Sequence, residues 1–164
     1  MYYELTDRFE VAADPDRTWA FFATADNLPL ITPPWLRFRL AGGRSAPIGP
    51  ESLLDYTIRW LGIPVKWRTK IIDWSPPRQF IDLQVRGPYA LWHHQHTFTP
   101  TPAGGTDCRD RVVYRVPLPA VGRLVHHAIV RRQLLEIFRF RRKVIGERLG
   151  GFRALQNDVQ IKPL

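Results

Sequence analysis

The sequence predicts an α+β fold with two layers, in which antiparallel β-hairpins pack against one long C-terminal helix. Residues 119–149 carry apolar residues at helical spacing and contain no proline after the first position. Residues 52–116 form short runs that alternate between apolar and polar side chains, separated by turns rich in Gly and Pro. With 164 residues, 45% of them hydrophobic, the chain can bury a sizeable core, so we expect one domain over residues 1–164.

The N-terminal part is predicted to form one strand and two short helices. Residues 2–11 alternate in the manner of a strand. Asp14 followed by Pro15 indicates a helix start, with aspartate as the N-cap and proline at the first helical position. We therefore expect a helix over residues 15–25 and a second helical turn over residues 26–31.

Six further strands are predicted before the long helix. They cover residues 35–40, 52–60, 65–74, 79–86, 89–99 and 106–116. In the hairpin joined by the turn at residues 61–64, alternation assigns one set of side chains to the inner face: Leu54, Tyr56, Ile58, Trp60, Val65, Trp67, Thr69 and Ile71. Residues 79–86 carry apolar side chains on both faces, so the sequence does not decide which of the two faces points inward.

The long helix is predicted to close the fold with an apolar stripe. A wheel drawn at about 100° per residue gathers Leu124, Ala128, Leu134, Leu135, Phe138, Ile145 and Leu149 on one side. Arg131 and Arg142 fall on the same side, and a buried guanidinium needs a carboxylate or an anionic ligand, with Asp82 as a candidate. Alternatively, both arginines reach the edge of the helix with their charged ends in water. Arg132, Arg139 and Lys143 are expected to be exposed.

The positive charge of the chain is concentrated on this helix. The net charge is +9, and residues 121–149 contain eight Arg or Lys residues but only two Glu. A basic helix can bind nucleic acid or an anionic membrane surface, and it can equally be a solvated outer face. No nucleic-acid-binding motif accompanies the charge, so we expect no specific nucleic-acid partner, while peripheral membrane contact and the oligomeric state stay open.

Several classes of protein are disfavoured by the sequence. No apolar run reaches the roughly 18 residues of a membrane span. The single cysteine, Cys108, excludes an internal disulfide framework and a thiolate metal cluster. Residues 1–11 resemble a strand and lack the apolar stretch of a signal peptide, so we expect a cytoplasmic location.

Two histidines on one strand are the clearest candidates for chemistry. His94 and His96 are two residues apart and therefore share a face with Trp92. If the last hairpin centres on residues 103–104, His96 lies opposite Asp110 and Trp92 opposite Tyr114. A His–Asp pair in an apolar cavity is suited to general acid–base catalysis, because the carboxylate fixes the imidazole tautomer. The alternative is a structural pair that satisfies two buried polar groups.

A metal site is not expected from this segment. His93 points to the opposite face, so at most two of the three histidines share a site, and a third ligand would come from Asp110 or elsewhere. The sequence contains no HExxH motif and no Cys/His spacing typical of zinc. We therefore expect neither a metal nor a cofactor.

The segments RGPYALWHHQHTF (residues 86–98), RDRVVYRVPL (109–118) and DWSPPRQF (73–80), with the Asp14-Pro15 helix start, resemble the SRPBCC superfamily. This superfamily includes START lipid-transfer domains, polyketide cyclases/dehydrases and birch-pollen-type allergens. The resemblance implies a helix-grip fold: a strongly curved seven-stranded antiparallel sheet wrapped around the long C-terminal helix, with a cavity between them and two short helices after the first strand.

The predicted function is to bind a small hydrophobic ligand, such as a lipid, a polyketide or an isoprenoid-like molecule, in that cavity. The predicted ligand-binding residues are Tyr56, Ile58, Trp60, Trp67, Trp92, His94, His96, Tyr114, Leu135, Phe138 and Arg142. One alternative is a metal-independent enzyme of the polyketide cyclase/aromatase type, with His96 and Asp110 as catalytic residues. The other is a membrane-surface or nucleic-acid binder that acts through the basic helix.

Overall fold

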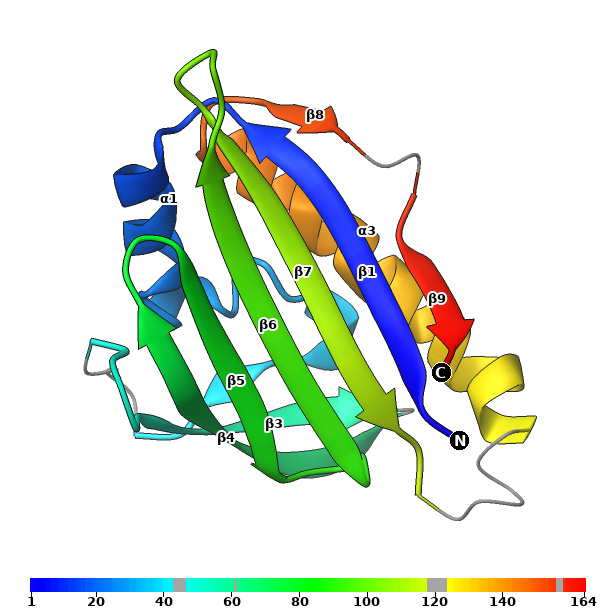
Figure 1. Ribbon diagram of the computed structural model, residues 1–164. Helices are drawn as coiled ribbons and strands as arrows, with labels where there is room; N and C mark the ends of the chain where they lie inside the picture. Colours follow the sequence, from blue (N-terminus) through cyan, green and yellow to red (C-terminus); the bar gives the residue numbers. More distant parts are fainter. Residues whose placement is uncertain (43–46, 61, 118–123, 156–157) are drawn as a thin grey trace.

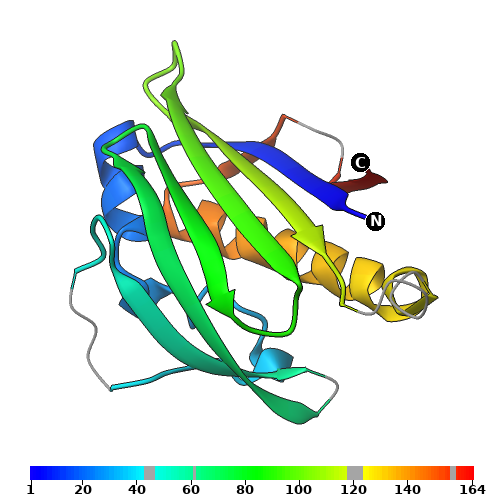
Figure 2. The same cartoon turned by 60° about the horizontal axis from the view of Figure 1, so that its bottom comes forward.

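A computed structural model describes residues 1–42, 47–60, 62–117, 124–155 and 158–164. In this part of the chain, one antiparallel sheet curves around a long helix (Figures 1 and 2). The strands are β1 Tyr3–Val11, β2 Arg39–Leu40, β3 Leu53–Trp60, β4 Ile63–Ser75, β5 Gln79–Arg86, β6 Leu91–Pro100, β7 Thr106–Arg115, β8 Phe152–Ala154 and β9 Gln160–Pro163. Their order is β2-β3-β4-β5-β6-β7-β1-β8, and β9 also pairs with β1.

The predicted α+β class and the curved antiparallel sheet are confirmed, and the chain adds two strands after the long helix. β8 and β9 pair with opposite halves of β1, which thereby has partners on both sides. This arrangement brings the two ends of the chain together, and the backbone N–H of Leu164 donates to the carbonyl of Tyr2 at 3.0 Å (Figure 1). An edge strand is thus covered by the chain's own C-terminal segment.

The helix start at Asp14 is confirmed. Helix α1 covers Pro15–Phe22, and Asp14 Oδ1 accepts a hydrogen bond from the backbone N–H of Arg17 at 2.9 Å. The single-turn 3₁₀ helices η1 (Ala25–Asn27) and η2 (Pro34–Leu36) follow. The strand predicted over residues 35–40 is wrong except for β2, because Pro34 starts a helical turn and Arg37 then takes a left-handed φ of 46°.

The alternation of the central hairpins decides which side chains face the helix. Tyr56 and Trp67 share the concave face, as predicted, and they lie directly opposite each other. The turn predicted over residues 61–64 is too long, because Ile63 and Pro64 already belong to β4 and pair with Trp60 and Arg59. The sequence left open which face of β5 points inward. It is the face that carries Phe80, since Phe80 is buried whereas Val85, on the other face, is 57% exposed. This face also carries Asp82 into the interior.

The long helix does not keep one regular geometry. Residues 124–125 are helical, His126–Val130 form the π-helix η3, and helix α3 covers Arg131–Arg148. Residues 119–123 of the predicted helix lie outside the described residues. Leu134, Phe138, Ile145 and Leu149 are buried as expected, and Arg132, Arg139 and Lys143 are exposed as expected.

The predicted burial of Leu124 and Ala128 is wrong, and Arg131, for which the sequence left burial and an exposed position open, takes the exposed one. All three are exposed, and 72% of Leu124 is accessible. In a π-helix the hydrogen bonds run from residue i to i+5, so each turn takes more residues than in an α-helix. The wheel drawn at a constant angle therefore assigned the wrong side to residues in and before η3.

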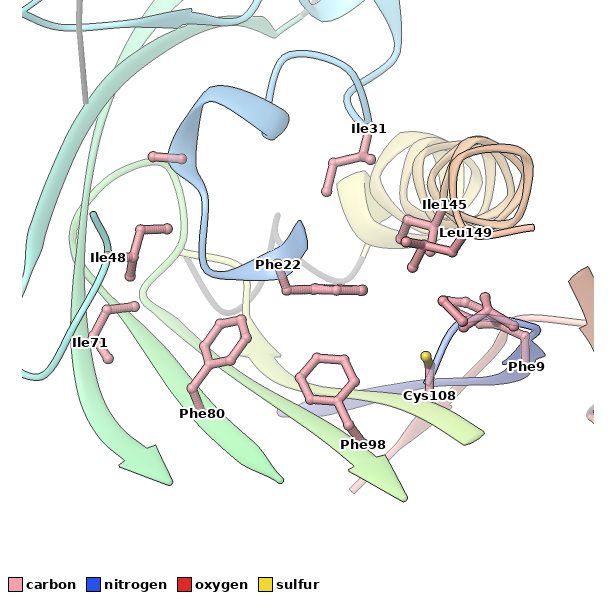
Figure 3. Packing of buried hydrophobic residues seen from close by; sticks show 13 residues of the cluster. Phe9, Phe22, Ile31, Ile48, Ile71, Phe80, Phe98, Cys108, Ile145 and Leu149 are labelled. Carbon is pink, nitrogen blue, oxygen red and sulfur yellow. The ribbon is translucent and has the colours of Figure 1, made fainter. Parts of the chain in front are cut away.

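The buried apolar residues form two clusters under the helix. In the first, Phe22 of α1 lies above Phe80 and Phe98 of the sheet, while Ile145 of α3 and Leu149, just after this helix, pack near Phe9 (Figure 3). The second cluster lies under the other half of the helix and consists of Tyr3, Leu5, Trp67, Trp92, Val112, Tyr114, Val130, Leu134, Phe138 and Val159. No helix in the described ranges is long and apolar enough to cross a membrane.

Candidate functional site

A cavity of about 180 Å³ lies between the concave face of the sheet, helix α3 and the segment that follows α1. Most of its wall is apolar. The aromatic lining residues are Phe21, Phe22, Phe38, Tyr56, Trp60, Trp67, Phe80, Tyr89, Trp92 and Phe138. The aliphatic ones are Leu28, Ile31, Leu36, Ile48, Leu54, Ile58, Ile71, Leu134 and Ile137. Such a wall suits a flat, hydrophobic molecule.

The aromatic rings hold one another in place. The rings of Tyr56 and Trp67 stack with centroids 5.8 Å apart, and Trp67 meets Trp92 edge to face at 5.5 Å. Trp60 donates its indole N–H to Gln133 Oε1 on α3 at 2.5 Å. Trp60, Trp67 and Trp92 line the same space as Phe138, which confirms the prediction that these three side chains point inward from their strands.

One end of the cavity is polar and charged. His96 Nε2 hydrogen-bonds to Asp82 Oδ2 at 3.1 Å, and His94 Nε2 hydrogen-bonds to Asp110 Oδ1 at 3.1 Å. The remaining ring nitrogens face the carboxylates crosswise: His94 Nδ1 lies 3.5 Å from Asp82 Oδ2, and His96 Nδ1 lies 2.7 Å from Asp110 Oδ1. Arg141 Nε lies 3.5 Å from Asp110 Oδ2. We call these five residues the polar cluster.

The sheet register positions this cluster. His96 lies directly opposite Asp110 on β7, as predicted from the hairpin length, and His94 lies directly opposite Asp82 on β5. Arg141 reaches the cluster from α3, where its guanidinium also lies over the Phe22 ring at 5.4 Å. Four elements therefore converge on one buried group of charges.

The protonation states follow from burial and mutual attraction. Burial raises the pKa of the Asp110 carboxyl, but Arg141 and the two histidines outweigh burial and hold this pKa well below its usual range. The same balance lowers the pKa of Asp82. Burial lowers the pKa of His96, yet the two carboxylates prevail and raise it.

For His94, burial and the charge on His96 prevail and its pKa is lowered. At a pH between the pKa values of His94 and His96, the cluster holds two carboxylates, one imidazolium, one guanidinium and one neutral imidazole. These charges cancel, which is what a desolvated site requires. The histidines titrate as a coupled pair, so the proton belongs to the cluster rather than to one ring.

A family model described as polyketide cyclase / dehydrase and lipid transport matches residues 11–139, most of the chain. The chain belongs to this family. No curated protein sequence matches it. Among solved structures, the Zhui aromatase/cyclase from Streptomyces sp. R1128 superposes with a TM-score of 0.67 at 16% identity, covering 90% of this chain and 93% of that one.

Two further structures are similar over most of this chain. A START superfamily protein from Mycobacterium smegmatis has a TM-score of 0.64 at 18% identity, covering 90% of this chain and 97% of that one. The di-domain ARO/CYC StfQ from the steffimycin biosynthetic pathway has a TM-score of 0.69 at 18% identity, covering 91% of this chain and 51% of that one. These likenesses establish the helix-grip fold of this member of the polyketide cyclase/dehydrase family.

In this family member, the structure places most of the predicted ligand-binding residues around the cavity. Tyr56, Ile58, Trp60, Trp67, Trp92, His94, His96 and Phe138 line it. The predicted catalytic residue Asp110 lies behind the histidines instead, with 4% of its side chain exposed. Its contact with His96 is present, but Asp110 itself is not part of the cavity wall.

The expected positions of Tyr114 and Leu135 in the cavity wall are wrong. Tyr114 is fully buried beyond the wall, where its hydroxyl hydrogen-bonds to His126 Nε2 at 2.8 Å. The rings of Tyr3 and His126 stack at 3.5 Å and close this corner of the core. Leu135 is half-buried on the flank of α3, because its neighbour Leu134 takes the inward position.

The predicted position of Arg142 in the cavity wall is wrong as well. Its Nη1 lies 3.2 Å from Asp7 Oδ1 on β1, and its Nη2 lies 3.4 Å from Asp158 Oδ1. The carboxylate that pairs with Arg142 is therefore Asp7 and not Asp82. Arg141 lines the cavity in place of Arg142. A signal was available, since Arg141 follows Phe138 by three residues and precedes Ile145 by four.

Proposed function

We propose that this chain binds a small hydrophobic molecule in the cavity, with an oxygen atom of the ligand directed at the polar cluster. The observation that carries the proposal is the combination of an aromatic wall with a buried charged group at one end. The apolar wall supplies affinity through removal of ligand surface from water. The charged end would fix the orientation of the ligand.

Unpaired donors near the cavity support a ligand with acceptor oxygens. Within the described residues, Trp67 Nε1 and Arg141 Nε are buried and have no hydrogen-bond acceptor. Both residues line the cavity. Arg141 keeps its ion pair with Asp110, so the cost of about 1–3 kcal/mol for a buried donor without a partner applies to Trp67, and a carbonyl, phenolic or carboxylate oxygen would recover this energy. A polyketide or a lipid carboxylate has the required combination of groups.

Filling the cavity should abolish binding without unfolding the protein. In Ile58→Trp, the indole would occupy space at the wall, whereas in Arg59→Trp, the next position on β3, the same side chain would point to solvent. We expect Ile58→Trp to lower affinity for the fluorescent probe anilinonaphthalene sulfonate at least tenfold and Arg59→Trp to leave it unchanged. Native mass spectrometry of the wild type would identify a retained ligand. Equal affinities in the two variants would contradict the proposal.

A second candidate is proton-transfer catalysis on the bound molecule, of the polyketide cyclase/aromatase type. His96 favours it, because this imidazole lines the cavity and contacts two carboxylates. In an enzyme of this type, Asp110→Asn would reduce turnover of a poly-β-ketone substrate far more than affinity for it. Turnover that survives this change would exclude the role of the His96–Asp110 pair.

The outer face of α3 gives no comparable support to membrane or nucleic-acid binding. Arg132 pairs with Glu136 and Lys143 with Glu147, each four residues apart on the helix. Arg139 pairs with Asp158. These exposed basic residues lie beside acids, which offset the positive charge that the helix would present to an anionic surface.

A further inference from the structure

We propose that Asp82, His94 and His96 form a binding site for a divalent transition-metal ion, Zn²⁺ or Fe²⁺, at the polar end of the cavity. Two imidazoles and one carboxylate are a donor set that both ions accept. One ligand atom from each residue lies within 4.8 Å of the others. The proposal adds a metal to the site of the proposed function and does not require a hydrophobic ligand to be bound.

The distances to the carboxylate fit a shared ion. Asp82 Oδ2 lies 3.1 Å from His96 Nε2 and 3.5 Å from His94 Nδ1. In a tetrahedral zinc site with bonds of about 2.0–2.1 Å, two ligand atoms are roughly 3.3 Å apart. Both distances from the Asp82 carboxylate are therefore close to the separation that coordination requires. The geometry assigns Nδ1 of His94 and Nε2 of His96 as the metal ligands.

Asp110 supplies the outer contact that metal-bound histidines require. Its Oδ1 lies 3.1 Å from His94 Nε2 and 2.7 Å from His96 Nδ1, the two ring nitrogens that the metal would not use. A ligating histidine almost always donates its other ring N–H to a carboxylate, a carbonyl or a water, and this contact fixes the tautomer and the ring orientation. Here one carboxylate lies beside both rings and is hydrogen-bonded to His94. The crosswise contacts of the cluster thus match an inner and an outer layer of ligands.

The charges in the cluster also suit a cation. Arg141 lies beside Asp110 Oδ2, so these two opposite charges offset each other. Asp82 remains as the anion for the metal, and His96 would release its proton on metal binding so that two neutral imidazoles complete the set. All three ligands line the cavity, whereas Asp110 lies behind them. A coordination position left open by the three residues would face the cavity, where a ligand oxygen or a water could occupy it.

A metal changes the role of His96. Its Nε2 cannot bind a metal and transfer a proton at the same time, so a metal ion would exclude proton transfer by this atom. The expectation from the sequence that no metal is bound rested on the absence of a metal-binding motif and on a third ligand that would have to come from Asp110 or elsewhere. The fold provides it from β5, because Asp82 lies directly opposite His94 in the sheet.

Zinc titration of the chelator-treated full-length chain tests the proposal. We expect one Zn²⁺ per chain by calorimetry, with histidine ¹⁵N shifts that place the metal on Nδ1 of His94 and Nε2 of His96. The variants Asp82→Asn and His96→Gln should lose this binding, whereas Asp110→Asn should weaken it by about 10–100-fold. The matched control is His93→Gln, on the opposite face of the same strand, and its affinity should equal that of the wild type.

Circular dichroism shows which variants fold, and the ¹⁵N assignment in the wild type decides the outcome if a variant does not. The proposal is overturned if no stoichiometric Zn²⁺ binding occurs, if Asp82→Asn binds as tightly as the wild type, or if the shifts fall on His93, His126 or His127. Anilinonaphthalene sulfonate binding, measured without metal, tests the proposed function separately. Failure of the metal-binding test therefore does not imply failure of the proposed function, and the reverse also holds.

Discussion

Replacing Arg141 by methionine should destabilise the protein by about 3–5 kcal/mol, because the change leaves a buried carboxylate with less compensating charge. The side chains of Arg141 and Asp110 are only 13% and 4% exposed. The charge of Arg141 is the largest single cause that lowers the pKa of Asp110, so this pKa should rise in the variant. The contact of the guanidinium with the Phe22 ring is lost as well. Urea unfolding followed by circular dichroism measures the change.

Arg132→Met is the matched control for this prediction. The Arg132 side chain is 84% exposed and pairs with Glu136 at 3.0 Å on the helix surface. Exposed pairs of this kind contribute about 0.3–0.5 kcal/mol, since water screens both charges. A loss in Arg141→Met no larger than that in Arg132→Met would show that the histidines alone stabilise Asp110.

Replacing Asp7 by asparagine should flatten the pH dependence of stability between pH 4 and pH 7. Burial and the charge of Asp110 raise the pKa of Asp7 to about 7, although Arg142 opposes them, and the ordinary value is 3.8. In this window the folded state holds a proton that the unfolded chain has released. The contribution of Asp7 to stability is therefore fully present below pH 4 and is lost as the pH rises to about 7.

As the pH rises from 4 to 7, the free energy of unfolding of Asp7→Asn should increase relative to that of the wild type. An upper bound is on the order of 4 kcal/mol, from about 1.4 kcal/mol for each pKa unit. Asp158→Asn serves as the control, because Asp158 also contacts Arg142 but its hydrogen bond with Arg139 is the main cause of a pKa near 2, below the window. Parallel stability curves for Asp7→Asn and the wild type would refute the raised pKa.

The hairpins and the inward face of β6 follow from the sequence alone. Alternation has a period of two, so once Trp67 and Trp92 are assigned to the interior, His94 and His96 must share it. The length of the last turn then sets the register that brings His96 opposite Asp110. These are local rules, in which each side chain is positioned by its neighbours within one hairpin.

Only the tertiary structure decided the rest of the polar cluster. β5 has apolar side chains on both faces, so its inward face depends on the burial gained against neighbouring strands, and that choice brought Asp82 to the histidines. The helix wheel assumed one angle per residue, but η3 changes the rotation before α3 begins. Packing against two sheet regions then directs Arg141 to the cavity and Arg142 to Asp7. Local periodicity specifies a face of an element, whereas which face is buried depends on contacts between residues far apart in the sequence.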